Sequence, residues 1–323
     1  MARFFPQQLS QQTHSLFVVV FLSLILFALP DYSSAQNAWL DEETYLTTFD
    51  VLTFNAGDGK HAFVEAFCHI STGNLQFVKS KTRFFASFRV VVSVRDVNAE
   101  VVASRQFIDS VWVDSFYDID DPRPVRVVRF TFLLEPGLYD IQMQVEDQET
   151  SRRLTVRRKM HVPDYAGVQP TMSDIQLATS IKVAREENML VKFGREIVPN
   201  IAHVVGLESD SVFAYCELYH LNGFTSSQQP GLVVTYSILD RNGRVVKSAF
   251  SLCHELAQEV SVASGFFTGD LDEGAYQMTV SVTAPAGTIL LQRATPFLLI
   301  RPEVDPGRVT QLLLRRFGKE AFF

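Results

Sequence analysis

The sequence predicts an all-β protein built from two tandem domains of the same kind, followed by a short amphipathic helix at the C-terminus. Three observations lead to this prediction. The chain of 323 residues repeats one pattern twice, its apolar and polar residues alternate, and turn-forming residues separate the alternating runs. Each half of the chain is long enough to enclose its own core.

The repeat consists of three blocks that occur in the same order in both halves. The matching blocks are residues 93–104 and 237–248, residues 134–145 and 271–282, and, more weakly, residues 63–67 and 215–219. The first pair shares a Ser-x-x-Asp-x-Asn-x-x-Val-Val-x-Ser pattern. We therefore predict two copies of one domain, with the matching blocks on equivalent strands.

Strands are predicted where apolar and polar residues alternate with period two. The clearest run extends from Phe84 to Arg95, where the even positions are Phe, Ala or Val and the odd positions include Ser and Arg. Residues 139–146, 232–239 and 276–283 alternate in a similar way. Many short strands of this kind favour two β-sandwiches.

The turns between strands differ in the two copies. Asn242-Gly243 is a strong signal for a type I′ hairpin turn, because both residues tolerate positive φ. The first copy has Asn98-Ala99 at this place, so we expect a type I′ turn only in the second copy.

In each copy a turn and a glycine precede a tyrosine that opens a late strand. Gly137 precedes Tyr139, and Gly274 precedes Tyr276. This arrangement is typical of the tyrosine corner of an immunoglobulin-like sandwich, in which the hydroxyl bonds to the preceding backbone. The alternative is a plain turn followed by an aromatic residue, and in both cases we expect the rings to be largely buried.

The N-terminal segment, residues 1–35, is predicted to be a secretory signal peptide. Arg3 supplies its positive charge, Leu16 to Leu29 is an uncharged apolar run, and Ser33-Ser34-Ala35 provides small residues for cleavage. An uncleaved membrane anchor is the alternative, but the run is shorter than the ~20 residues of a spanning helix. We expect an extracytoplasmic protein, in the periplasm or at the cell surface, with no stable membrane span after cleavage.

The remaining chain is predicted to contain three parts. The first β-sandwich covers residues 36–165, the second covers residues 166–302, and a helix with a tail covers residues 303–323. The joint lies at residues 164–170, which are rich in Pro and Gly. The stretch from Ser173 to Ala178 fits either a capped helix start or the first strand of the second domain, and we favour the strand.

The C-terminal helix is predicted from its capping residues and its apolar stripe. Asp305 is a plausible N-cap and Pro306 fits the first helical position. The stripe consists of Val309, Leu312, Leu313 and Phe317. A helix this short is marginal alone, so we expect it to bind a partner, to self-associate or to pack loosely on the second domain.

Several of these features together resemble the N-terminal region of bacterial GWxTD-motif proteins. They are the segments 63–67, 134–139, 173–178, 199–200 and 215–219, together with the signal peptide and the joint. The sequence departs from the family because no Gly-Trp-x-Thr-Asp occurs, and neither Trp39 nor Trp112 lies in such a context. The resemblance implies a secreted, envelope-associated protein without an assigned reaction, and it transfers no functional residues.

Two charged clusters are candidates for ligand binding. The acidic one consists of Asp114, Asp118, Asp120 and Asp121, with Tyr117. These oxygens suit Ca²⁺, but the spacing is not that of an EF-hand, so we favour a solvated loop. The basic one consists of Arg152, Arg153, Arg157, Arg158 and Lys159. It suits an anionic glycan or lipid, but we favour a guard on an exposed edge strand.

The cysteines and histidines show no metal-ligand spacing. His69 follows Cys68 and His254 follows Cys253, yet neither pair has a matching second pair. Alternation places Cys68 and Cys216 among apolar residues, so we expect both to be buried. A disulfide between Cys216 and Cys253 is left open.

We therefore predict no catalytic residue, no cofactor and no metal, and we expect no enzyme. No nucleophile elbow, phosphate loop or dinucleotide fingerprint is present. A net charge of −7 disfavours nucleic acid as a partner.

The favoured function is a non-enzymatic interaction or structural module of the bacterial envelope, with a protein partner there. One alternative is a carbohydrate- or ligand-binding sandwich, for which the available rings are Trp39, Trp112, Phe116 and Tyr117. The other is a truncated or accessory part of a larger GWxTD-type protein.

Overall fold

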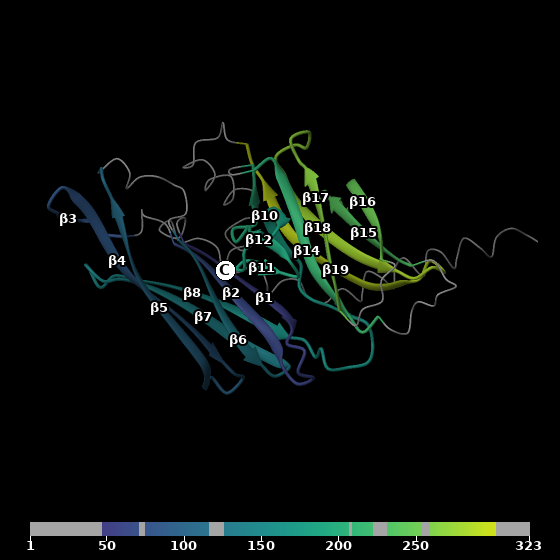
Figure 1. Cartoon of the computed structure of the whole chain (residues 1–323), viewed down its shortest axis with the longest axis horizontal. Coiled ribbons are helices and arrows are strands. Elements are labelled where there is room, and N and C mark those ends of the chain that lie inside the picture. The colour runs from purple at the N-terminus through teal and green to yellow at the C-terminus, as the bar shows by residue number, and fades with distance from the viewer. Residues whose placement is uncertain are drawn as a thin grey trace, which may run out of the picture.

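The computed structural model describes residues 47–70, 75–115, 126–206, 209–221, 231–253 and 259–301. The predicted signal peptide, most of the acidic cluster and the predicted C-terminal helix lie outside these residues. The described part of the chain is all-β, as predicted, and contains no helix. The strands fall into two groups, β1 to β8 and β9 to β19, which form the two lobes seen in Figure 1.

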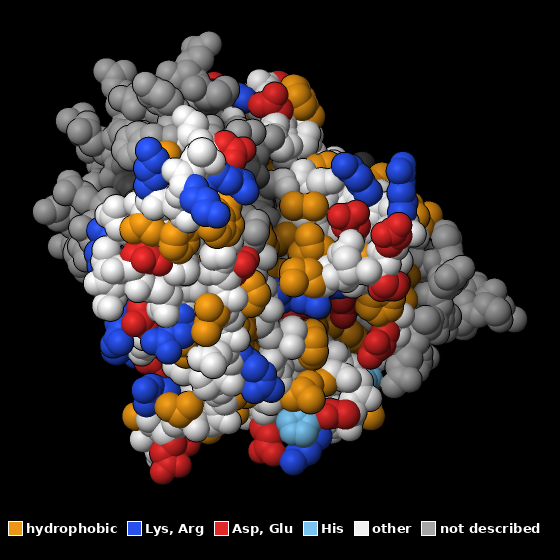
Figure 2. Space-filling model, turned by 60° about the vertical axis from the view of Figure 1, so that its left-hand side comes forward, with side chains coloured by type: hydrophobic (Ala, Val, Ile, Leu, Met, Phe, Trp, Pro, Cys, Tyr) orange, Lys and Arg blue, Asp and Glu red, His pale blue; other side chains and the backbone are white. Residues whose placement is uncertain are grey.

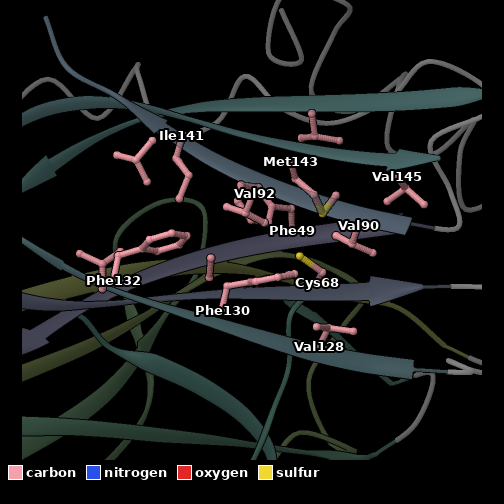
Figure 3. Packing of buried hydrophobic residues seen from close by; sticks show 14 of the residues in the cluster. Phe49, Cys68, Val90, Val92, Val128, Phe130, Phe132, Ile141, Met143 and Val145 are labelled. Carbon is pink, nitrogen blue, oxygen red and sulfur yellow. The ribbon is translucent and has the colours of Figure 1, made fainter. Parts of the chain in front are cut away.

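The first domain is a sandwich of two sheets. Its strands are β1 (Thr47–Asn55), β2 (Ala62–Ile70), β3 (Val78–Ser80), β4 (Arg83–Arg95), β5 (Val101–Val113), β6 (Arg126–Leu134), β7 (Gly137–Asp147) and β8 (Arg153–Val162). One sheet has the order β1-β2-β6, and the other has the order β3-β4-β7-β8 with β5 paired to β4. Both sheets contribute alternate residues to one core, in which Cys68 points toward Met143 and Val90 (Figure 3).

The second domain repeats this plan. Its strands are β9 (Thr171–Met172), β10 (Gln176–Val183), β11 (Val191–Lys192), β12 (Arg195–Pro199), β13 (Val204–Val205), β14 (Ser211–Tyr219), β15 (Leu232–Leu239), β16 (Val245–Cys253), β17 (Glu259–Phe267), β18 (Gly274–Thr283) and β19 (Ile289–Leu299). One sheet has the order β11-β12-β10-β14-β17 with β9 paired to β14, and the other has the order β13-β19-β18-β15-β16. A second core lies between them. Residues 171–172 and 176–178 pair with β14, so the strand interpretation of this region is confirmed.

The repeat blocks lie on equivalent elements, as predicted. Asp96 and Asp240 begin the β4–β5 and β15–β16 hairpins, and in each turn the backbone N–H groups two and four residues later donate to the Asp carboxylate. The prediction of a type I′ turn in the second copy was wrong. Among these turn residues only Gly243 and Ala99 have positive φ, at 75° and 63°, so each turn is followed by a bulge.

Both tyrosine corners are present. The Tyr139 hydroxyl donates to the Glu135 carbonyl at 3.0 Å, and the Tyr276 hydroxyl donates to the Asp272 carbonyl at 2.7 Å. These bonds are a feature of immunoglobulin-like sandwiches. The rings are only half-buried, in contrast to our expectation, because the hydroxyls point outward to a turn at the domain surface.

The two sandwiches stack through their β1-β2-β6 and β10-β14-β17 sheets. A third hydrophobic cluster lies between these sheets, and its members come from both domains: Leu52, Phe54, Phe67, Ala178, Ile197, Ile201 and Tyr215. The molecule therefore has four sheet layers, and apolar side chains are buried at the interface between the two domains.

Candidate functional site

The weakest repeat block of the sequence forms the centre of the interface between the two domains. Glu65 on β2 and Glu217 on β14 occupy matching places in the block, and both side chains are buried. On each strand the neighbouring even positions point into the domain's own core, whereas the two glutamates point toward the other domain. The interface thus contains two buried acidic groups that need partners.

Lys192 of β11 provides the partner for Glu65. Its ammonium group donates to the Glu65 carboxylate and to Gln176 Oε1 at 2.9 Å, and it lies 3.6 Å from the centre of the Phe54 ring. Arg129 of β6 donates to the other Glu65 oxygen at 3.0 Å. Burial lowers the pKa of Lys192, and the negative charge of Glu65 opposes this effect. A lysine of the second domain therefore lies in a polar and aromatic pocket formed by both domains.

Glu217 is held by two tyrosines of its own strand. The Tyr215 and Tyr219 hydroxyls each donate to one Glu217 oxygen at 2.7 Å. Burial raises the pKa of Glu217, although these hydrogen bonds and Lys192 favour its charged form. Tyr219 also accepts the backbone N–H of Asn55 at 3.0 Å, which links this group to the first domain.

The open edge of β1 is covered by the second domain. Asp174 accepts hydrogen bonds from the backbone N–H and the hydroxyl of Thr53, at 2.8 Å and 2.7 Å, and its own N–H donates to the Thr53 carbonyl. Arg293 of β19 binds the other Asp174 oxygen at 2.6 Å. The backbone groups of Thr53 at this edge are therefore hydrogen-bonded within the chain.

A third polar group, around Asp50 of β1, lies at the side of the interface. Arg158 Nη1 is 2.8 Å and His203 Nε2 is 3.1 Å from the Asp50 carboxylate, and His203 Nδ1 is 3.1 Å from the Pro296 carbonyl. Burial alone would raise the pKa of Asp50, but His203 and Arg158 together lower it. These contacts connect β1 of the first domain to His203 and Pro296 of the second.

These groups form a structural site, because each of the buried carboxylates is bound by donors fixed in the surrounding strands. The described residues contain no group of three or more His, Cys, Asp or Glu side chains that could hold a metal ion. None of the three cysteines forms a disulfide, and all are buried. The bridge between Cys216 and Cys253 that the sequence left open is therefore absent. Burial raises the pKa of Cys216 to about 12, so this thiol is not a nucleophile at neutral pH.

The structure divides the basic cluster that the sequence suggested, and of the acidic cluster it describes Asp114. Asp114 pairs with Arg83 at 2.6 Å, while residues 116–125 lie outside the described residues. The basic stretch belongs to β8, which is an edge strand of its sheet. Its members do not act together, because Arg158 binds Asp50 at the interface while Arg153 pairs with Glu146 on the outer face.

Of the paired cysteine and histidine residues, Cys68 lies in the first core and His69 on the opposite side of β2. Burial lowers the pKa of His69 to about 4, so the ring is neutral at pH 7. His254 lies outside the described residues. Of the four rings proposed for carbohydrate binding, Trp112 is described, and it is 47% exposed and stacked on Phe85.

The visible surface mixes charges of both signs with small apolar groups (Figure 2). No helix among the described residues has the length and hydropathy that crossing a membrane requires. The fold and the interface thus define a protein of two immunoglobulin-like sandwiches joined by a buried polar contact.

Comparison with known proteins adds no family. No family model matches the sequence, and no curated protein matches it. Among solved structures, it is similar to a tetra-tandem repeat from the extending region of a large adhesion protein, with 13% identity and a TM-score of 0.21. That match covers 79% of this chain and 50% of the other, so the chain spans about half of that structure. Fibronectin(III)-like modules of Clostridium thermocellum CbhA match with 13% identity and a TM-score of 0.20, over 79% of this chain and 97% of theirs.

The interface residues were not singled out by the sequence reasoning, although a signal for them exists. A glutamate between two aromatic residues of the same strand face occurs in both copies, in Phe63-x-Glu65-x-Phe67 and Tyr215-x-Glu217-x-Tyr219. A charge repeated on an otherwise apolar face indicates a buried polar contact.

Proposed function

We propose that the chain is a non-enzymatic structural and interaction module that works outside the cytoplasm, in the bacterial envelope. Its two sandwiches act as one rigid body that presents the outer sheets at a fixed relative orientation. The insertion of Lys192 between Glu65, Gln176 and the Phe54 ring is the observation that carries this proposal. A contact of this kind has directional bonds from both domains, so sliding or hinge motion would leave buried charges unpaired.

Distance measurements between spin labels test the rigidity. Val97 and Arg241 occupy equivalent exposed places in the two hairpins, and the native cysteines are buried, so Val97→Cys with Arg241→Cys provides two selective labelling sites. We expect one narrow distance distribution for the otherwise unchanged chain. A matched variant with Lys192→Ala should give a broader one. A broad distribution without that substitution would contradict the rigid module.

The extracytoplasmic location rests on the sequence of residues 1–35 and on the resemblance to GWxTD-motif proteins. Expression in a bacterial host, followed by fractionation and intact-mass measurement, tests it. We expect a mature chain that begins at Gln36. Retention of Met1 in the exported protein would favour the membrane anchor instead.

One observation supports a second candidate, a carbohydrate-binding function. Trp112 is half-exposed on the outer face of the β4–β5 hairpin and stacks on Phe85 with ring centres 5.0 Å apart. Aromatic faces of this kind can stack on sugar rings. Titration of neutral polysaccharides against tryptophan fluorescence should then show binding that Trp112→Ala removes, and equal binding by both proteins would exclude this site.

A further inference from the structure

One edge strand differs in its charged and apolar residues between the two copies of the domain. The second strand of the β4–β5 hairpin and the second strand of the β15–β16 hairpin each lie at the edge of their sheet. Ser104 and Ser248 pair with Ser93 and Ser237 at the same place in the two hairpins, which fixes the alignment of the strands. The first copy therefore serves as an internal reference for the second.

In β5 the edge carries the charges that normally prevent pairing with another chain. Arg105 and Asp109 lie on the inward-facing side of β5. The Arg105 guanidinium lies over the Phe132 ring, 5.9 Å from its centre. Inward-pointing charges on an edge strand oppose the approach of a further strand.

In β16 these charges are missing. Ala249 and Cys253 replace Arg105 and Asp109 at the aligned positions, and Phe250 and Leu252 replace Gln106 and Ile108 on the outer face. Phe250 is 72% exposed and Leu252 is 51% exposed. The charged residue of β16, Lys247, is engaged by Asp270 at 2.7 Å. Apart from this inward-facing lysine, whose charge is neutralised by Asp270, the edge is apolar, and an apolar edge strand is prone to pair with another chain.

The neighbouring outer face is also uncharged. Its residues on β15, β18 and β19 are Val233, Thr235, Ser237, Leu239, Gln277, Thr279, Ser281, Thr283, Gln292, Ala294, Pro296 and Leu298. The matching face of the first domain includes Arg89, Arg95, Asp140, Glu146, Arg153, Arg157 and Lys159. Two such uncharged faces can be brought side by side without repulsion between like charges.

We propose that β16 pairs antiparallel with β16 of a second copy of this chain, which joins two five-stranded sheets into one continuous sheet. The register that uses all nine residues of β16 places Ala249 opposite the partner's Ala249. Lys247 then faces the partner's Ser251, Val246 faces the partner's Leu252, and Phe250 lies diagonal to the partner's Phe250. This register contains no like-charge pair, and its apolar residues meet on one face. The proposal is independent of the proposed function, because a monomer can still be a rigid module.

Sedimentation velocity of the purified exported chain tests the proposal. We expect a dimer at protein concentrations of about 10–100 µM. The double variant Phe250→Lys with Leu252→Lys should be monomeric at these concentrations. The matched control is Gln106→Lys with Ile108→Lys on β5, which should remain dimeric. Circular dichroism should show that both variants are folded, since the substituted side chains are on the outer faces.

A cysteine substitution tests the register. Ala249→Cys should form a disulfide-linked dimer under mild oxidation, because directly opposed residues of antiparallel strands can have the Cα separation that a disulfide requires. Arg105→Cys on β5 should stay monomeric on a non-reducing gel.

Two outcomes would overturn the proposal: a monomeric chain throughout this range, or a dimer that survives the β16 lysines. If deletion of residues 303–323 dissociates a dimer that the β16 lysines leave intact, association occurs through the C-terminal tail instead.

Discussion

Replacement of Lys192 by methionine tests the role of the interface in stability. Methionine keeps most of the apolar stem and removes the ammonium group, so the change is mainly electrostatic. Glu65, which is only 1% exposed, would lose one of its two cationic partners, and Gln176 would lose its donor at 2.9 Å. Loss of one partner of a buried pair costs about 3–5 kcal/mol, and because Arg129 remains at 3.0 Å we expect the lower end of this range.

Urea unfolding followed by circular dichroism measures this effect. We expect the transition to shift to lower urea and to broaden, because weaker coupling lets the domains unfold separately. Addition of Glu65→Gln to Lys192→Met should recover part of the loss, since the unpaired charge is removed. Lys60→Met provides the control, because Lys60 pairs with Glu135 at 2.8 Å at the exposed surface and its loss should leave the midpoint unchanged. A loss below about 1 kcal/mol for Lys192→Met would refute the reasoning.

Three further predictions concern the turns, the corners and the interface glutamate. Ala99→Gly should stabilise the chain by about 0.5–1 kcal/mol in denaturant unfolding, because Ala99 has φ of 63°, and Gly243→Ala should destabilise it similarly; a shift in the same direction for both would contradict the turn geometry. Tyr139→Phe and Tyr276→Phe should each lower the unfolding free energy by about 1 kcal/mol through loss of the corner hydrogen bond, and an unchanged value would show that the bond contributes nothing. Burial raises the pKa of Glu217, so the folded state loses stability as pH rises from the ordinary carboxyl pKa through the raised one. The melting temperature of Glu217→Gln should therefore increase relative to that of the wild type as pH rises from about 4 to 7. If the difference between the two melting temperatures is the same at every pH, the pKa of Glu217 is not raised in the folded state.

The sequence determined the strands, the repeat and the corners, because these depend on local patterns. Alternation from Phe84 to Arg95 specifies which residues enter the core, and the Gly-x-Tyr spacing specifies a hydroxyl that reaches the carbonyl four residues earlier. The prediction of a type I′ turn was wrong because Asn242-Gly243 also suits a turn that is followed by a bulge. The length of the loop between β15 and β16 depends on where the two strands begin to pair, and the dipeptide does not determine this.

Only the tertiary structure decided how the two domains meet. Lys192 and Asp174 read as ordinary surface charges in the sequence, because their partners are between 16 and 127 residues away along the chain. The same applies to Arg158, which belongs by sequence to a basic stretch and by structure to the Asp50 group. Pairing of buried charges depends on which sheet faces come together, and period-two alternation is the same for a face that meets solvent and for a face that meets another domain.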